Sequence, residues 1–480
     1  MQQDQYALVG GNIIAANGDA PITDGVILVN QGRIQAVDHR QKLTLPDGIE
    51  QIDISGKWVT PGLIDTNVHL ILMTVPEFFV KYEDQWEEIA LQAAQVGLKY
   101  GLTTMADTWG PLPPLLQVRD KINRGEAVGS RMLIGGNIVG TGGPFTAFFM
   151  GGWDLGGASL RYGGWVHPKI QDRINRLWED EVGPDMAALT PNEAGERLAK
   201  YLTKGVDFVK VGVSAHGISP VEPLVFSAPA LRAMRDATLD AGVPFQTHTF
   251  TVESLRMALE VNTTLLQHPN VMSVSWQSAS SAQKQAIKNM IDQIAEEKTH
   301  VGLMMVPDKQ QLARYKQWQL EGEQDPHLEN VLLERWPMMT EENYQNQKQA
   351  LQPWLREDLL ITLATDAGLE SADIGPVVWG RLGRAHFDRL RNLQEVGLSP
   401  MQVIMSATRN GAQALGIGHD TGTIEVGKFA DLLVINSNPL DDVSNLKQIH
   451  AVIKEGQIVD RDALPINAIL DSDPEAVWPH

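Results

Sequence analysis

The hydrophobic pattern divides this chain of 480 residues into β-rich ends and an alternating middle. Residues 6 to 57 hold short apolar runs separated by turn residues, which is typical of β-strands. The C-terminal end shows the same pattern of short apolar runs and turn residues, in "GTIEVGKFADLLVINS" and "IHAVIKEGQIVDRD". The two ends are therefore expected to form one small domain together.

Between these ends, short apolar runs are each followed by a stretch with helical periodicity. Eight such runs are present: "TPGLIDT", "GLTTMAD", "SRMLIGGNI", "GVDFVKVGV", "GVPFQTH", "TTLLQH", "HVGLMMV" and "LLITLATDA". The expected helices cover residues 84–99, 113–125, 228–241, 251–261, 281–296, 340–353 and 399–415. This α/β alternation predicts a (β/α)₈ TIM-type barrel.

Two excursions from the alternating pattern are long. Residues 139–190 follow the third predicted strand, and residues 306–358 follow the seventh. Loops that follow barrel strands lie at the carboxyl face, where barrel enzymes hold their active sites. Both excursions are expected to be lids or walls for a substrate.

The amino-acid composition limits which reactions, metal ligands and partners are expected for this chain. The chain has no cysteine, which excludes disulfides and thiolate catalysis and limits a metal site to His, Asp, Glu, Asn or a modified Lys. A net charge of −20 argues against a nucleic-acid partner. The N-terminus shows no secretory signal and no apolar run is long enough for a membrane span, so we expect a cytoplasmic protein without a membrane partner.

Polar side chains recur at the ends of the predicted strands. They are Asn67 and His69 after the first strand, Lys210 in the fourth, His248, His268 and Asp366 after the fifth, sixth and eighth. Any one of them has a structural explanation: a hydrogen-bonded histidine, a buried amine or a helix cap. Together they would meet at one mouth of a closed barrel, which favours a metal site.

This arrangement resembles the amidohydrolase superfamily, in its imidazolonepropionase/Xaa-Pro dipeptidase-like branch. The motifs "PGLIDTNVHL", "TDAG" and "GTIEVGKFADLLVIN" carry the resemblance over nearly the whole chain. It implies a barrel over residues 60–416 and a β-sandwich domain assembled from residues 1–59 and 417–480. It also implies a homo-oligomer that acts on a small molecule.

The resemblance implies a role for each strand-end residue. The metal ligands would be Asn67, His69, Lys210, His248, His268 and Asp366. Lys210 matches a lysine that is carboxylated in many members, and Asp366 matches the acid that also shuttles protons. The family normally has His-x-His after the first strand, whereas Asn67 stands at the first of these positions.

An amide oxygen binds Zn or Co less well than imidazole nitrogen does, so Asn67 predicts an altered centre with one or two ions. Zn, Co and Mn all fit, with or without a carbamate on Lys210. The Asn-x-His motif resembles the subgroup of phenylurea and molinate hydrolases. That subgroup implies cleavage of a C–N or C–S bond in an amide, urea, carbamate or thiocarbamate.

Further residues are candidates around this site. His216 is expected to orient substrate or stabilise an oxyanion, with a hydrogen bond within its loop as the alternative. Phe145, Phe148 and Trp153 are expected to wall an apolar pocket, with packing of the excursion against the barrel as the alternative. Two other functions stay open. One is a dipeptidase or cyclic-amide hydrolase, and the other is a barrel that has lost catalysis and serves as a binding or scaffold protein.

Overall fold

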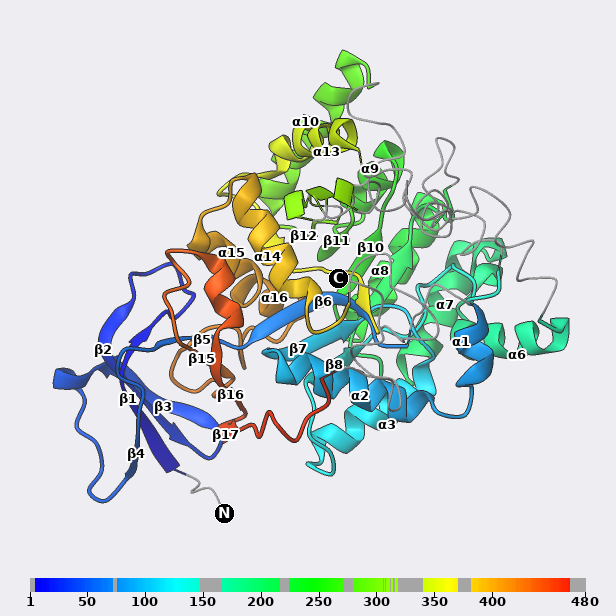
Figure 1. Ribbon diagram of the computed structural model, residues 1–480. Coiled ribbons are helices and arrows are strands. Elements are labelled where there is room, and N and C mark those ends of the chain that lie inside the picture. Colours follow the sequence, from blue (N-terminus) through cyan, green and yellow to red (C-terminus); the bar gives the residue numbers. More distant parts are fainter. Residues whose placement is uncertain are drawn as a thin grey trace.

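The structure is a computed structural model. It describes residues 5–71, 76–146, 166–215, 224–270, 279–304, 306, 308–310, 312–313, 316–317, 340–369 and 381–466. A β-rich unit lies at one side and an α/β unit at the other (Figure 1). Within the described residues, no helix is long and apolar enough to cross a membrane.

Strands from both ends of the chain share one sheet, as the sequence predicts. The order β17-β16-β15-β5-β1-β2-β3, with β4 paired to β1, mixes the two ends. The N-terminal strands are β1 (Gln5–Ile13), β2 (Ile22–Asn30), β3 (Arg33–His39), β4 (Glu50–Asp53) and β5 (Trp58–Pro61). The C-terminal strands are β15 (Leu432–Ile435), β16 (Ile449–Lys454) and β17 (Gln457–Ile458). Apolar side chains from both ends form a core of their own.

The eight predicted barrel strands are all present and run parallel to their neighbours. They are β6 (Leu63–His69), β7 (Leu102–Asp107), β8 (Arg131–Ile134), β9 (Val209–Gly212), β10 (Phe245–His248), β11 (Leu265–Gln267), β12 (His300–Gly302) and β13 (Leu360–Thr362). Two sheets result, β6-β7-β8 with the short β14 (Ala367–Gly368), and β9 to β13. Backbone hydrogen bonds join the two sheets at both edges, from Thr66 N to the Leu363 carbonyl (2.9 Å) and from Val139 N to the Lys210 carbonyl (2.8 Å).

Helices lie between the strands and cover the parallel sheets (Figure 1). Their bounds are α1 (Pro76–Lys81), α2 (Trp86–Lys99), α3 (Leu112–Asn123), α6 (Pro168–Glu179), α7 (Pro191–Leu202), α8 (Ala228–Asp240), α9 (Val252–Glu260), α10 (Ser281–Glu297), α13 (Glu341–Leu351) and α14 (Ala385–Val396). Capping boxes fix several starts; for example, Ser280 and Gln283 exchange hydrogen bonds at the beginning of α10.

One predicted helix is interrupted. Instead of a single helix over residues 399–415, the chain forms α15 (Pro400–Ser406) and α16 (Arg409–Ala414). The Ala407 carbonyl between them accepts a hydrogen bond from Ile64 N (2.7 Å) in β6. This long-range bond takes a carbonyl that a continuous helix would use, which explains the break.

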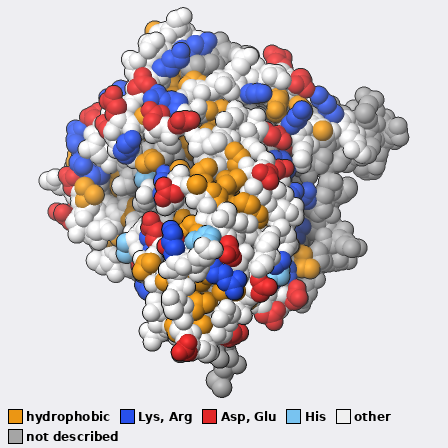
Figure 2. Space-filling view, turned by 90° about the vertical axis from the view of Figure 1, so that its left-hand side faces the viewer, with side chains coloured by type: hydrophobic (Ala, Val, Ile, Leu, Met, Phe, Trp, Pro, Cys, Tyr) orange, Lys and Arg blue, Asp and Glu red, His pale blue; other side chains and the backbone are white. Residues whose placement is uncertain are grey.

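An ion-pair cluster connects the two units. Arg131 at the start of β8 bonds Asp431 (2.6 Å) and Glu455 (2.6 Å) of the C-terminal segment. On the face drawn in Figure 2, acidic and basic side chains are interspersed rather than gathered by sign. Although the chain has a net negative charge, this face therefore carries no patch of a single sign.

Candidate active site

The six strand-end residues are all buried at the carboxyl side of the barrel. Asn67 and His69 are the fifth and seventh residues of β6, Lys210 is the second of β9, and His248 is the last of β10. His268 follows β11 directly, and Asp366 follows β13. None is more than 5% exposed. They share one place because the strands are parallel and their carboxyl ends meet.

The Asp366 carboxylate is the point at which three of these side chains meet. Its Oδ1 lies 2.9 Å from His69 Nε2, 2.9 Å from Asn67 Nδ2 and 3.7 Å from His268 Nε2. Burial alone would raise the pKa of Asp366, but His69, His268 and Lys210 outweigh burial and hold the pKa well below its usual range. The carboxylate is thus kept ionised.

The amide of Asn67 is held from both ends. Its Oδ1 accepts from the Thr108 hydroxyl and from Lys210 Nζ (3.4 Å), while its Nδ2 faces Asp366 and His268 Nε2 (3.2 Å). An ammonium only donates and a carboxylate only accepts, so both ends require the same amide orientation. Asn67 therefore presents N–H groups to the centre.

Lys210 lies behind Asn67. Its Nζ also approaches the Thr108 hydroxyl at 3.2 Å. Burial lowers the pKa of Lys210 to about 8, although Asp366 and Asp107 act in the opposite direction. Thr108 was not singled out from the sequence, because a threonine after a strand has no distinguishing pattern.

His248 packs against an aromatic neighbour, Phe250. Its ring lies 5.3 Å from the ring of His268 and 4.2 Å from that of Phe250, which is itself 5.9 Å from His268. Phe250 is 2% exposed and packs beside both imidazole rings. It too lacked a sequence signal, since a buried phenylalanine is ordinary.

Asp107, at the end of β7, supports His69 through the backbone. Its carboxylate accepts from Leu70 N (2.7 Å) and Trp109 N (3.2 Å). Burial raises the pKa of Asp107 to about 6, opposed mainly by His69. The strand end that carries His69 is thereby tied to the loop that carries Trp109.

A chain of aromatic rings leads away from the site. Trp109 lies edge-on to His69 with ring centres 6.4 Å apart, and Trp178 follows at 5.8 Å. Phe79 is 5.1 Å from Trp178, and Phe145 is 6.1 Å from Phe79. Phe145 is half-buried and packs against this cluster. Phe148, Trp153 and His216 lie outside the described residues.

The donor set suits a divalent transition metal, which binds imidazole and carboxylate well. Ligands about 2.0–2.1 Å from one zinc ion lie roughly 3 Å from one another, and the separations of 2.9 and 3.7 Å around Asp366 are of that order. Among the described residues, however, no three His, Asp or Glu side chains already stand in a ligating arrangement. The residues fit a metal by the chemistry of their donor atoms, which are imidazole nitrogens and a carboxylate.

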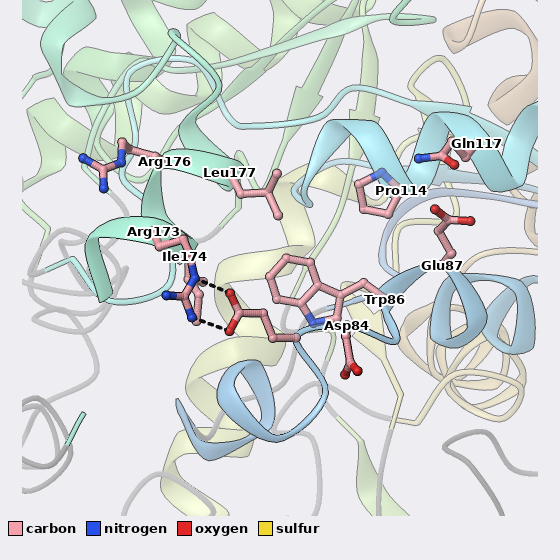
Figure 3. A pocket seen from close by; sticks show the side chains of 10 residues that line it. Asp84, Trp86, Glu87, Pro114, Gln117, Arg173, Ile174, Arg176 and Leu177 are labelled. Atoms are coloured by element: carbon pink, nitrogen blue, oxygen red, sulfur yellow. Dashed lines mark hydrogen bonds and ion pairs between the residues drawn. The ribbon is translucent and has the colours of Figure 1, made fainter. Parts of the chain in front are cut away.

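A surface pocket of about 510 Å³ lies away from these side chains. Trp86, Ile174 and Leu177 give it an apolar wall, and the Arg173–Glu83 ion pair (2.6 Å) borders it (Figure 3). None of the strand-end residues lines this pocket. The candidate site is therefore defined by its polar cluster and not by this cavity.

The model of the amidohydrolase family matches residues 58–459, and the chain belongs to that family. Its family and its structural neighbours mark it as a hydrolase. The superfamily resemblance drawn from the sequence is confirmed.

Two solved structures are similar over nearly the full length. Molinate hydrolase is 28% identical with a TM-score of 0.83, covering 99% of this chain and 98% of that one. Phenylurea hydrolase B is 30% identical with a TM-score of 0.82, covering 98% and 100%. A Xaa-Pro dipeptidase shares the fold at 20% identity and a TM-score of 0.65, covering 95% and 99%.

Curated relatives match over shorter stretches. Adenine deaminase 4 of Rhizobium meliloti is 40% identical over 82 residues, which are 17% of this chain and 13% of that protein. The 5-methylthioadenosine/S-adenosylhomocysteine deaminase of Symbiobacterium thermophilum is 27% identical over 165 residues, 30% and 36% of the two chains. The chain thus spans well under two thirds of the length of these curated relatives.

Proposed function

We propose that this chain is a metal-dependent hydrolase of a C–N or C–S bond in an amide, urea, carbamate or thiocarbamate of a small hydrophobic molecule. The observation that carries the proposal is the convergence of His69, His268 and Asn67 on the ionised Asp366 carboxylate. The near full-length likeness to molinate hydrolase and phenylurea hydrolase B supports the choice of bond.

The metal would be held by His69, His248, His268 and Asp366. A divalent ion such as Zn, Co or Mn supplies an activated water near neutral pH and polarises a carbonyl. With the metal bound, Asp366 would accept a proton from that water and return it to the leaving nitrogen or sulfur.

Asn67 and Lys210 have different parts. In the orientation described, Asn67 donates to Asp366 at 2.9 Å and steadies the carboxylate. Lys210 and Thr108 hold the amide from behind. With Asn67 as a donor and Lys210 as a free amine, the site favours a single metal ion. A carbamate on Lys210 would favour two metal ions, because its negative charge is shared between two cations.

The experiment is turnover of a substrate panel by wild-type protein and by Asp366→Asn. The panel holds an N-aryl urea, an S-alkyl thiocarbamate, an aryl amide, a hydantoin and a Xaa-Pro dipeptide. We expect hydrolysis of the urea, thiocarbamate or amide. Asp366→Asn should keep its metal under excess metal but lose turnover by about 10²–10⁴-fold, as when general acid–base catalysis is removed.

The matched control is Asp358→Asn, which changes an aspartate on the surface that pairs with Arg356. It should retain full activity. Near-normal turnover by Asp366→Asn would overturn the assigned role. Hydrolysis of the hydantoin or the dipeptide alone would replace the proposed bond class with that of the cyclic-amide hydrolases or dipeptidases.

A further inference from the structure

Asp366 has a backbone conformation that needs support. Its φ angle is 62°, in the left-handed region that residues other than glycine seldom adopt. Such a conformation costs about 1–3 kcal/mol and persists only where the surroundings hold it. The carboxylate reaches His69 and Asn67 from this conformation. What holds the backbone therefore also aims the carboxylate.

A second carboxylate, that of Asp65, holds the residue before Asp366. Asp65 accepts from Thr365 N (3.1 Å), from Thr365 Oγ1 (2.6 Å) and from Asn67 N (3.2 Å). Asp65 is fully buried in β6 and lies two residues before Asn67. One side chain thus joins the strand that carries Asn67 to the loop that carries Asp366.

Arg389 of α14 holds the same residue from the other side. Its guanidinium donates to the Thr365 carbonyl (3.4 Å) and to the Leu303 carbonyl (2.8 Å). Burial lowers the pKa of Arg389, and the charges of Asp65 and Asp366 oppose that effect. The positive charge of the buried Arg389 is thus partly compensated by the carboxylates of Asp65 and Asp366.

The peptide groups on either side of Asp366 are engaged as well. Asp366 N donates to the Asn67 carbonyl (2.8 Å), and Ala367 N donates to Thr365 Oγ1 (3.2 Å). Thr365 is therefore fixed through its N–H, its carbonyl and its hydroxyl. The Thr365 hydroxyl links Asp65 and Ala367, because it donates to the Asp65 carboxylate and accepts from Ala367 N.

We propose that Asp65, Thr365 and Arg389 form a brace that positions the Asp366 carboxylate for metal binding and proton transfer. These are positioning residues, since they act through Asp366 and do not touch the reacting atoms. The inference rests on the role proposed above for Asp366. It assigns a task to a buried aspartate and a buried arginine that the hydrolytic mechanism itself does not use.

The test is the affinity of the purified protein for Zn²⁺ or Co²⁺, measured by competition with a chelator. Thr365→Val keeps the side-chain shape and removes the hydroxyl. We expect its dissociation constant for the metal to rise about 10–100-fold, the usual effect of losing a group that orients a ligand. Thr365→Ser retains the hydroxyl and should stay within about threefold of wild type.

Thr362→Val is the matched control. Thr362 is equally buried three residues earlier, and its hydroxyl lies 3.0 Å from that of Thr66. Both valine variants lose one buried hydroxyl, so both melting temperatures should fall. Only Thr365→Val should weaken metal binding. If Thr365→Val does not fold, Asp65→Asn tests the same hydrogen bonds, with the same rise expected.

Asp366→Ala separates the two claims. If it binds metal as tightly as wild type, the proposed role of Asp366 is wrong. If Asp366→Ala weakens metal binding but Thr365→Val and Thr362→Val bind metal equally well, only the brace is wrong.

Discussion

At the residue scale, Asn67 presents a different kind of chemical group to the centre of the site than a histidine would. With Oδ1 engaged by Thr108 and Lys210, its Nδ2 points at Asp366 and His268. A histidine at this position would present a lone pair to a metal, whereas the amide presents N–H groups. In this arrangement the Asn67 side chain therefore acts as a hydrogen-bond donor to Asp366.

Thr108 should matter for stability because it satisfies a buried acceptor. Thr108→Val leaves Asn67 Oδ1 with Lys210 alone at 3.4 Å. Leaving a buried polar group poorly paired costs about 1–3 kcal/mol. We expect a loss of that size in the free energy of unfolding, measured by urea denaturation. Thr103→Val is the control, since the Thr103 hydroxyl makes one long bond (3.4 Å) to the Leu63 carbonyl. Equal losses in the two variants would contradict the assignment.

The sequence located most of this cluster because polar residues ended apolar runs. The ends of parallel strands come together, so Asn67, His69 and Asp366 could be grouped without coordinates. Thr108 and Phe250 could not be found in this way, because a threonine in a loop and a buried phenylalanine are common. Their importance depends on which neighbour they touch.

At the scale of elements, short apolar runs identified all eight barrel strands. Seven of the strands are shorter than their runs, and β6 is as long as its run but begins three residues later. The predicted helix over residues 399–415 was wrong in its continuity. Its break depends on the bond between Ile64 N and the Ala407 carbonyl, which joins residues far apart in sequence. The local hydrophobic periodicity cannot predict a hydrogen bond between residues so far apart in sequence.

The aromatic cluster beside the site should couple packing to metal binding. Trp178 is fully buried and contacts Phe79, Trp86 and Trp109. Trp178→Leu should destabilise the fold by about 2–4 kcal/mol, as large-to-small core changes do. Because Trp109 stands edge-on to His69, the variant should also bind Zn²⁺ more weakly.

Trp354→Leu provides the comparison. Trp354 is 2% exposed and lies in the turn after α13. This variant should lose similar stability by urea denaturation but keep the metal affinity of the wild type. Equal metal affinities in the two leucine variants would argue that the aromatic cluster serves stability alone.

At the scale of the molecule, buried histidines should make stability depend on pH. Burial lowers the pKa of His386 to about 4, while its Nε2 bonds the Tyr100 carbonyl (3.0 Å). The folded state therefore resists protonation that the unfolded chain accepts near pH 6.5. The stability contributed by neutral His386 is present above pH 6.5 and is lost as the pH falls toward 4.

The slope should approach about 1.4 kcal/mol per pH unit for this one proton. His386→Asn should remove that share of the slope in urea unfolding measured from pH 7 to pH 4.5. An unchanged slope in His386→Asn would contradict the burial argument.

The most direct test of the account is the metal content of wild-type protein and Asn67→His, by elemental analysis after purification without chelators. We predict one equivalent in the wild type, because Asn67 offers N–H groups where a second ion would need a ligand. Asn67→His should bring the content toward two. Two equivalents in both proteins would show that Asn67 binds metal, and no metal in the wild type even after added Zn²⁺ or Co²⁺ would contradict the proposed hydrolase.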